Sequence, residues 1–171
     1  MIKAGYCSGL IGRIIEMHAR YYSRTTGFGV VFETKVAREL AEFATRLDRP
    51  GNMIWHAEHD GLIIGSIAID GCDLGQNRAH LRWFIIDDGF RAHGLGKALL
   101  DEAIGFCDRH GFDEVHLWTL KGLDAARQLY ERNGFELAEE YRGDQWGREI
   151  TEQKYIRSRA HPAPPPSPLQ K

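Results

Sequence analysis

The sequence has 171 residues, of which 43% are hydrophobic and 27% are charged, and its net charge is −2. This length suffices for one compact domain with a real core and is short for two. The small net charge and the scattered basic residues argue against a polyanionic or membrane-surface partner, so we expect neither nucleic acid nor membrane binding.

Cysteine and histidine positions favour neither disulfides nor a metal site. Cys7, Cys72 and Cys107 are isolated and odd in number, which is typical of a reducing compartment. His56 and His59 lie three apart in an expected strand, where they would face opposite sides of the sheet. We therefore expect no metal, and by default a cytoplasmic protein, because charges interrupt the apolar N-terminal residues.

In the first half of the chain, the spacing of hydrophobic residues changes from the helical period to the period of two that is typical of strands. A Thr- and Gly-rich loop at residues 24–31 separates two expected helices, and the second helix ends at Pro50-Gly51. Asp60-Gly61 between two strand-like runs is a strong hairpin signal. The expected elements are a helix over about residues 8–23, a second helix carrying Val36 to Leu47, and strands at Met53–His59, Leu62–Asp70 and Ala79–Asp87.

The second half alternates helices and strands and ends in a proline-rich tail. Its expected elements are a helix at Gly94–His110, a strand at Glu114–Leu120, a helix at Leu123–Asn133, and strands near Phe135–Tyr141 and Thr151–Ile156. This order predicts an α/β (α+β) fold, a mixed sheet with helices on both faces. Five of the six prolines follow residue 161, so we expect a domain at 1–157 and a disordered tail at 158–171.

A glycine-containing loop follows the third expected strand and opens a helix. It reads Arg91-Ala92-His93-Gly94-Leu95-Gly96-Lys97. Glycines let the backbone approach a ligand, and the first N–H groups of a helix are unpaired donors in the favourable field of the helix dipole. The loop therefore predicts a pyrophosphate site with Arg91 and Lys97 at its rim, although glycines here also suit tight strand–helix packing.

Two familiar phosphate loops do not match this segment. A Walker A loop requires Ser or Thr after Gly96-Lys97, where the chain has Ala98, and a dinucleotide fingerprint requires a third glycine where Leu99 stands. The pattern Arg-x-x-Gly-x-Gly is instead similar to the coenzyme A signature of the GCN5-related N-acetyltransferase (GNAT) superfamily.

A second segment, Leu123-Asp-Ala-Ala126-Arg-Gln-Leu-Tyr130 followed by Gly134-Phe135, resembles the second cofactor motif of the same family. Ala126 and Tyr130 share one helical face, so the resemblance implies a small residue beside the pantetheine arm and a tyrosine acid. Taken alone, a tyrosine at this helical spacing is more often a core aromatic than a catalytic acid. The family's usual asparagine is replaced by Leu123, which removes one polar contact to the cofactor.

The narrowest resemblance is to acetyltransferase domains that follow MarR-type winged helices. It rests on Trp118-Thr119, on the Ala-Ala-Arg of the helix, and on Trp146-Gly147 with Gln153-Lys-Tyr155. The sequence itself contains no such DNA-binding module. The family resemblance implies a mostly antiparallel GNAT sheet of about six to seven strands.

The resemblance also implies a function. We expect transfer of an acetyl group from acetyl-CoA to an amine of a small molecule or peptide, by direct attack in a ternary complex; a non-catalytic acyl-CoA sensor is the alternative. Tyr130 is the expected catalytic acid, and a homodimer through the last strands is implied. The expected cofactor-binding residues are Phe84, Ile85, Ile86, Arg91, Ala92, His93, Gly94, Leu95, Gly96, Lys97, Ala126 and Tyr130.

The general base and the acceptor stay open at this stage. The resemblance places the base among Glu33, Glu58, His80 and Arg82, with water-mediated deprotonation equally allowed. The acceptor pocket is expected between residues 24–32 and the hairpin tip at residues 142–148. Its expected aromatic lining is Phe28, Phe32, Trp83 and Trp146.

Overall fold

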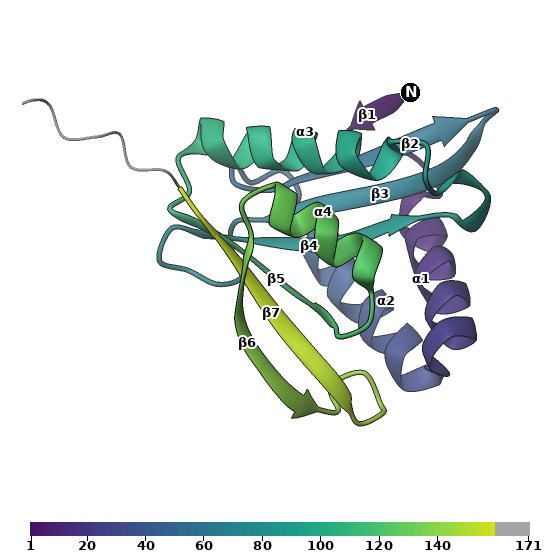
Figure 1. Cartoon of the computed structure of the whole chain (residues 1–171). Coiled ribbons are helices and arrows are strands. Elements are labelled where there is room, and N and C mark those ends of the chain that lie inside the picture. The colour runs from purple at the N-terminus through teal and green to yellow at the C-terminus, as the bar shows by residue number, and fades with distance from the viewer. Residues whose placement is uncertain (160–171) are drawn as a thin grey trace, which may run out of the picture.

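The computed structural model describes residues 1–159, which form one open seven-stranded sheet with four α-helices (Figure 1). Neighbouring strands follow the order β1-β2-β3-β4-β5-β7-β6. The elements are β1 (Ile2–Ala4), α1 (Leu10–Thr26), α2 (Val30–Ala44), β2 (Met53–His59), β3 (Leu62–Asp70), β4 (Arg78–Ile86), a 3-10 turn (Asp88–Phe90), α3 (Leu95–His110), β5 (Glu114–Leu120), α4 (Asp124–Arg132), β6 (Glu136–Gly143) and β7 (Ile150–Ser158).

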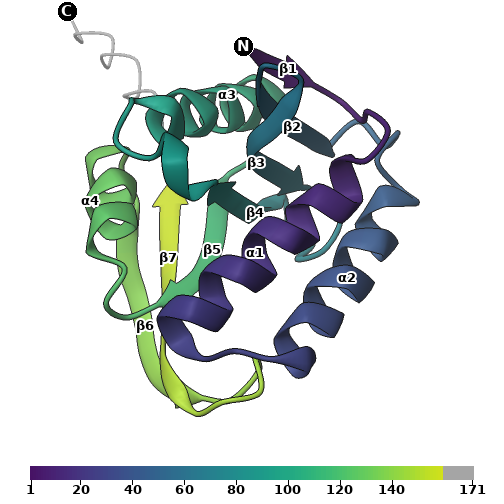
Figure 2. The same cartoon turned by 90° about the vertical axis from the view of Figure 1, so that its right-hand side faces the viewer.

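Helices cover both faces of the sheet. Helices α1 and α2 lie together on one face, and α3 and α4 lie on the other, as the two cartoon views show (Figure 2). The α1–α2 side has its own buried cluster, which includes Leu10, Ile14 and Leu40, whereas Leu99, Leu100 and Phe135 belong to the cluster on the α3–α4 side. Burial of apolar side chains on both faces is what makes the central strands almost continuously hydrophobic.

The sheet opens in its middle. Strands β4 and β5 run parallel and pair only at the start, where residues 78–80 lie opposite residues 114–116. Beyond His80 the two strands separate, and β5 continues as the antiparallel partner of β7 from Glu114 to Leu120. Because a β-strand edge without a neighbour exposes N–H and C=O groups, this opening leaves free backbone donors and acceptors on β4.

A β-bulge in β4 shapes the same region. The pairing of β3 with β4 shifts between Ser66 and Ala68, and Trp83 takes a φ of 47°, which is unusual for a residue with a Cβ. Leu81 therefore packs on the α3–α4 side, whereas Trp83 and Ile85 pack on the α1–α2 side. The bulge shifts the second half of β4 by one residue, so the side chains no longer alternate between the two faces of the sheet in one continuous pattern.

The predicted fold class is confirmed, and four details differ from the sequence expectations. Strand β1 was missed, because three residues without an alternating pattern carry no strand signal until they pair with β2. Helix α1 extends to Thr26 and α2 begins at Val30, so the predicted loop at residues 24–31 is mostly helical. Strand β7 ends at Ser158, and residues 160–171 of the predicted tail lie outside the described residues.

Over residues 1–159, no helix combines the length and apolar character that a membrane crossing requires.

Candidate functional site

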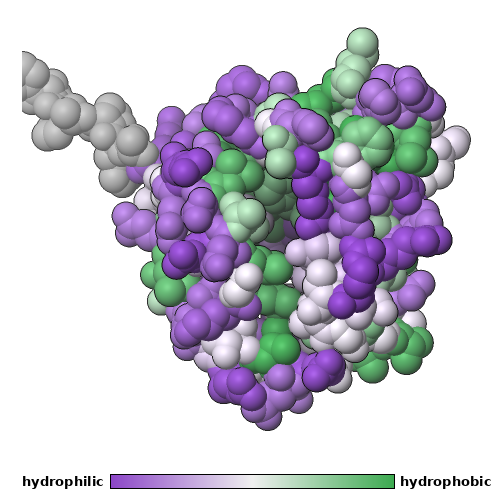
Figure 3. Space-filling model, turned by 45° about the vertical axis from the view of Figure 1, so that its right-hand side comes forward, coloured by the Kyte–Doolittle hydropathy of each residue, from purple (hydrophilic) through white to green (hydrophobic). Residues whose placement is uncertain are grey.

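A groove of about 660 Å³ passes through the opening between β4 and β5. Its walls come from α1, α2, the diverging ends of β4 and β5, α4, and the β6–β7 hairpin. In the space-filling view, hydrophobic side chains lie in a hollow of the face between α1 and α4, bordered by hydrophilic ones (Figure 3). A concave site with an apolar floor and polar walls is the usual form of a small-molecule site.

Tyr130 of α4 lies where the groove meets the α3–α4 layer. Its side chain is buried, and its ring centroid lies 6.2 Å from that of Phe84 on β4 and 5.8 Å from that of Phe135. Burial raises the pKa of the Tyr130 phenol, and the neighbouring Tyr22 and Tyr155 add to the effect. The phenol therefore stays protonated near neutral pH, as a proton donor requires. Ala126, one turn earlier, packs against the same core.

The glycine loop forms the N-terminus of α3, as the sequence predicts. Gly94 is the N-cap with a φ of 76°, and no side chain caps the helix. The first N–H groups of α3 are therefore available to an anion. A Cβ added to Gly96 would lie 3.6 Å from both Leu129 of α4 and Phe84 of β4. The loop, the free part of β4 and the helix that carries Tyr130 are thus direct neighbours.

Neither basic residue of the loop points freely at this helix terminus. Arg91 donates from Nε and Nη2 to the Ile86 carbonyl at 3.1 and 2.9 Å, and its guanidinium lies 3.9 Å from the ring centre of Tyr21. Lys97 Nζ lies 2.6 Å from a carboxylate oxygen of Asp101. Both side chains are engaged within the chain, so the unpaired backbone N–H groups at the start of α3 are the donors that stay open to an anion.

Five of the twelve predicted cofactor residues are exposed, and the rest are wholly or partly covered. Four of them form the stretch from Arg91 to Gly94 on the outside of the loop, and the fifth is Lys97 in the first turn of α3. Phe84 and Ile86 pack toward α3 and α4, whereas Ile85 packs toward α1 and α2. The structure therefore brings Phe84, Ile86, Leu95, Gly96, Ala126 and Tyr130 together, and it places Ile85 on the opposite face of β4.

A network of ion pairs lines the wall formed by β4 and α2. Asp70 is fully buried and pairs with Arg46, and Arg82 lies between Glu39 and this carboxylate. His80 Nδ1 lies 2.5 Å from an Asp73 oxygen. Burial lowers the pKa of His80, and the Asp73 carboxylate only partly opposes this shift. The His80 imidazole is therefore neutral near pH 7, which is the state that accepts a proton.

The four aromatic residues that were expected around the acceptor lie together in this groove. Phe28, Phe32, Trp83 and Trp146 all line the groove, together with residues of the predicted hairpin tip. Of the four candidate bases, His80 and Arg82 line it. Glu58 instead pairs with Lys3 at the opposite end of the sheet, and Glu33 borders a separate depression on α1 and α2.

Three further residues that the sequence does not predict as part of the site also line the groove, namely Tyr22, Trp118 and Glu152. Tyr22 lies one helical turn after His18 on the covered side of α1, and that spacing was the available signal. Trp118 belongs to the Trp118-Thr119 motif on which the family resemblance partly rests. Its position in the groove wall, however, follows only from the separation of β4 and β5. Glu152 had no signal, because glutamate in a strand is ordinarily read as exposed.

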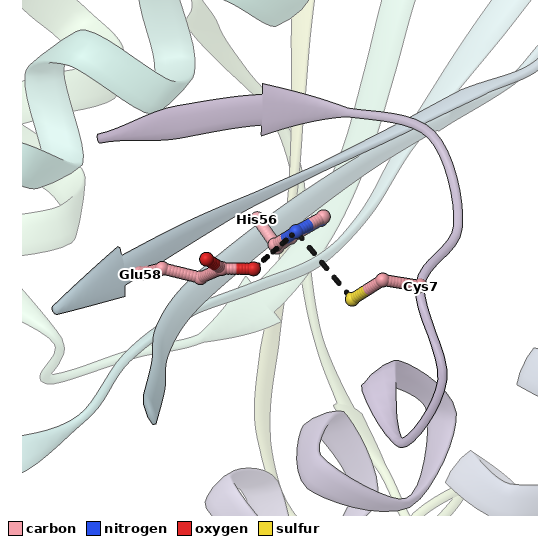
Figure 4. A group of neighbouring side chains, drawn as sticks. All are labelled: Cys7, His56 and Glu58. Atoms are coloured by element: carbon pink, nitrogen blue, oxygen red, sulfur yellow. Dashed lines mark hydrogen bonds and ion pairs between the residues drawn. The ribbon is translucent and has the colours of Figure 1, made fainter. Parts of the chain in front are cut away.

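A second cluster lies away from the groove, where the loop after β1 meets β2 (Figure 4). His56 Nε2 lies 3.5 Å from Cys7 Sγ and 3.1 Å from Glu58 Oε1, and the three donor atoms lie within 4.8 Å of one another. Glu58 also forms a 2.5 Å ion pair with Lys3, which already neutralises its charge. Three donors with a resident lysine make a hydrogen-bonded cluster, and a structural zinc site ordinarily has four ligands. The expectation of no metal stays a prediction.

The family model of the Acetyltransferase (GNAT) family matches residues 13–135, which include β4, the glycine loop, α3 and α4. The chain belongs to the GNAT family. The solved structures agree on the fold. A GNAT-family acetyltransferase from Staphylococcus aureus Mu50 has a TM-score of 0.74 at 22% identity and covers 92% of this chain and 99% of its own. A putative acetyltransferase from Salmonella typhimurium, solved with its cofactor acetyl-CoA, has a TM-score of 0.73 at 16% identity and covers 96% and 98%.

Curated GNAT relatives are longer than the region they share with this chain. N-acetylaspartate synthetase from Danio rerio is 30% identical over 122 residues, which is 71% of this chain and 43% of the relative. An uncharacterised N-acetyltransferase from Methanocaldococcus jannaschii is 28% identical over 130 residues, 72% of this chain and 56% of the relative. The chain thus spans about half the length of these relatives.

Proposed function

We propose that this GNAT chain is an N-acetyltransferase that transfers an acetyl group from acetyl-CoA to an amine. The observation that carries the proposal is the opening between β4 and β5, which exposes the edge of β4 beside Tyr130, while the uncapped N-terminus of α3 lies next to Phe84 of the same strand. These residues fit the group: the N–H groups of α3 suit a pyrophosphate, and the β4 edge suits the amides of an extended pantetheine arm.

The residues of the chain have complementary roles in this proposal. The N–H groups of residues 94–97 hold the pyrophosphate, and β4 N–H groups in residues 84–86 stabilise the oxyanion that develops on the thioester carbonyl. The neutral amine forms the new C–N bond as the C–S bond breaks. Tyr130 then supplies its phenolic proton to the departing sulfur, and the excess proton on nitrogen passes to a base or to water.

Two routes for deprotonating the acceptor remain in the proposal. His80 lines the groove, is neutral near pH 7 and is oriented by Asp73, so it is the candidate among the predicted bases that the geometry favours. Water in the open groove is the second route. The acceptor is an amine of a small molecule or peptide, and aspartate is one candidate because the curated relatives include N-acetylaspartate synthetases.

The test is release of free thiol from acetyl-CoA across a panel of amino acids, polyamines, arylalkylamines and peptide N-termini. Turnover that depends on an added amine supports the proposal, with the acetylated amine identified by mass spectrometry. Binding of acetyl-CoA measured by calorimetry without turnover on any acceptor would instead support a non-catalytic acyl-CoA sensor. Failure to bind acetyl-CoA would overturn both functions.

Three narrower expectations also stay proposals. The resemblance to domains that follow MarR-type winged helices rests on the short motifs around Trp118 and Trp146 alone. Homodimerisation through the last strands is supported by β6, an edge strand on which Leu137 and Tyr141 are exposed. Sedimentation measurements would show a dimer of about twice the chain mass of 19.4 kDa. A cytoplasmic location is proposed from the free cysteines.

A further inference from the structure

Glu152 is a buried carboxylate in the wall of the groove. It lies in the middle of the β5–β7–β6 sheet, opposite Leu120 and Tyr141, and is only 1% exposed. Its Oε2 accepts a 2.8 Å hydrogen bond from Gln145 Nε2, the Tyr141 phenol lies beside the carboxylate, and Oε1 has no hydrogen-bond partner among the described residues. A buried charged oxygen without a donor is costly, so its presence calls for an explanation.

The surrounding backbone holds this carboxylate closely. A Cβ on Gly143 would lie 2.5 Å from both Cδ and Oε1 of Glu152, so glycine at this position leaves the space that the carboxylate occupies. Gln145, the donor to Oε2, belongs to the exposed tip of the same hairpin. An ammonium group has three donors, and it could satisfy Oε1 and take over the bond that Gln145 now makes.

The charges that line the groove favour a cation. Five carboxylates line it against three Lys or Arg side chains: Glu39, Glu42, Asp73, Asp144 and Glu152 against Lys35, Arg46 and Arg82. Each of the three basic side chains already has a carboxylate partner. Within the described part of the chain, no lining Lys or Arg is left over to receive the carboxylate of a substrate, and a second negative charge would be repelled.

The neighbouring wall is aromatic. The ring centroids of Phe28 and Phe32 lie 5.0 Å apart, and those of Phe28 and Trp146 lie 6.3 Å apart, and Trp146 directly follows Gln145 in the chain. Aromatic faces attract cations and provide apolar area for a hydrocarbon or ring. This end of the groove therefore matches a positively charged group attached to an apolar body.

We propose that Glu152 binds a positively charged group of the acceptor, and that the acceptor is a cationic amine without a carboxylate. This inference rests on the proposed acetyltransferase function and narrows its substrate class. It separates arylalkylamines and diamines from amino acids such as aspartate. Glu152 acts here in binding the protonated acceptor, and both the deprotonation of the reacting amine and the chemistry at the thioester belong to other residues.

Calorimetry with the chain saturated in coenzyme A tests binding directly, independently of turnover. The probes are 2-phenylethylamine and phenylalanine, which share an aromatic body and an amine and differ by one carboxylate. We expect 2-phenylethylamine to bind at least about tenfold more tightly, a factor typical for one unfavourable charge contact. Glu152→Gln should weaken 2-phenylethylamine at least about tenfold and leave coenzyme A affinity within about twofold.

Glu136→Gln is the matched control, since it removes the same charge from an exposed position of β6 in the same hairpin. Gly143→Ala is a second variant, because its methyl group would displace the Glu152 carboxylate, and it should weaken the amine as Glu152→Gln does. Equal binding of the two probes, or unchanged amine affinity in a folded Glu152→Gln protein, would overturn the inference. Failure of the wild-type protein to bind coenzyme A would instead count against the acetyltransferase proposal.

Discussion

Ser66 donates a 2.8 Å hydrogen bond from its buried hydroxyl to the carbonyl oxygen of Trp83, the residue at which β4 bulges with a positive φ. The bond ties the strained residue of β4 to the neighbouring strand β3. It therefore stabilises the β-bulge, at which the side chains of β4 change face so that Trp83 points toward α2 and Phe84 toward Tyr130. The shape of the groove depends on this pair.

Ser66→Ala should destabilise the fold by about 1–2 kcal/mol, because the Trp83 carbonyl would lose a buried donor. Urea unfolding followed by tryptophan fluorescence measures this change. Ser23→Ala, on the exposed side of α1, is the control and should change stability by less than about 0.5 kcal/mol. Equal unfolding midpoints for the two variants would show that the bond does not hold the bulge.

Tyr130→Phe should lower kcat by about 10²- to 10⁴-fold, the usual contribution of a positioned proton donor. The ring and its packing against Phe84 and Phe135 are retained, so acetyl-CoA affinity should stay within about twofold. Tyr6→Phe, at a side chain that is 61% exposed, controls for loss of a phenol elsewhere. Full turnover in Tyr130→Phe would remove Tyr130 from the role of acid.

Gly94→Ala should weaken coenzyme A binding, because a Cβ is strained at a φ of 76° and the helix N-terminus must shift to relieve it. A cost of about 1 kcal/mol corresponds to a roughly fivefold higher Kd. Pantetheine, which lacks the pyrophosphate, should bind the variant and the wild type equally in competition measurements. Gly105→Ala, in the middle of α3, should leave both affinities unchanged, and an equal loss for pantetheine would contradict a pyrophosphate site here.

Acidification should lower the stability of the fold, because His18 is buried in its neutral form. Burial lowers its pKa in the folded protein to about 4, and the hydrogen bond that Nδ1–H donates to the Ile14 carbonyl at 2.8 Å only partly opposes this. Below the ordinary value of 6.5 the unfolded chain binds the proton that the folded chain refuses. The neutral His18 imidazole therefore makes its full contribution to the free energy of unfolding above pH 6.5. This contribution, about 3 kcal/mol, is lost as the pH falls toward 4.

Urea unfolding of the wild type and of His18→Gln at pH 7.5 and pH 4.5 isolates this contribution from that of the other titrating groups. The wild type should lose more stability between the two pH values than the variant does. Parallel losses would show that the buried imidazole is not responsible.

Two glycines of one helical segment should respond in opposite directions to alanine. Gly12 lies inside α1, and a Cβ there would meet nothing within 4 Å, so Gly12→Ala should stabilise the protein by about 0.5–1 kcal/mol. Gly9 is the N-cap with a φ of 86°, and Gly9→Ala should destabilise it by about 1 kcal/mol. Thermal unfolding measures both, and shifts of the same sign would contradict the geometry.

Much of the site was predictable because its parts are local in sequence. Asp60-Gly61 forms the β2–β3 turn with φ values of 48° and 76°, as the dipeptide indicates. The loop from Arg91 to Lys97 needs only a strand end, glycines and the start of a helix, all within one stretch of chain. Ala126 and Tyr130 share a helical face by spacing alone.

The remaining features depend on pairing between distant segments, and local patterns do not contain that information. Strand β1 exists because it pairs with β2, and the bulge at Trp83 appears only in the register with β3. Arg91 and Lys97 carry the predicted charge, but the tertiary contacts with Ile86 and Tyr21 decided where Arg91 points. Burial of a side chain is a sum over neighbours from the whole chain.

The sequence by itself determined the family, the order of the elements after β1, the glycine loop at the start of α3 and the helical face shared by Ala126 and Tyr130, since each follows from residue type at fixed spacing. Only the tertiary structure decided that β5 leaves β4 after His80, that Glu152 is buried in the resulting groove, and that the basic residues lining this groove are paired. The physical reason is that desolvation and charge pairing are set by which distant strands and helices meet.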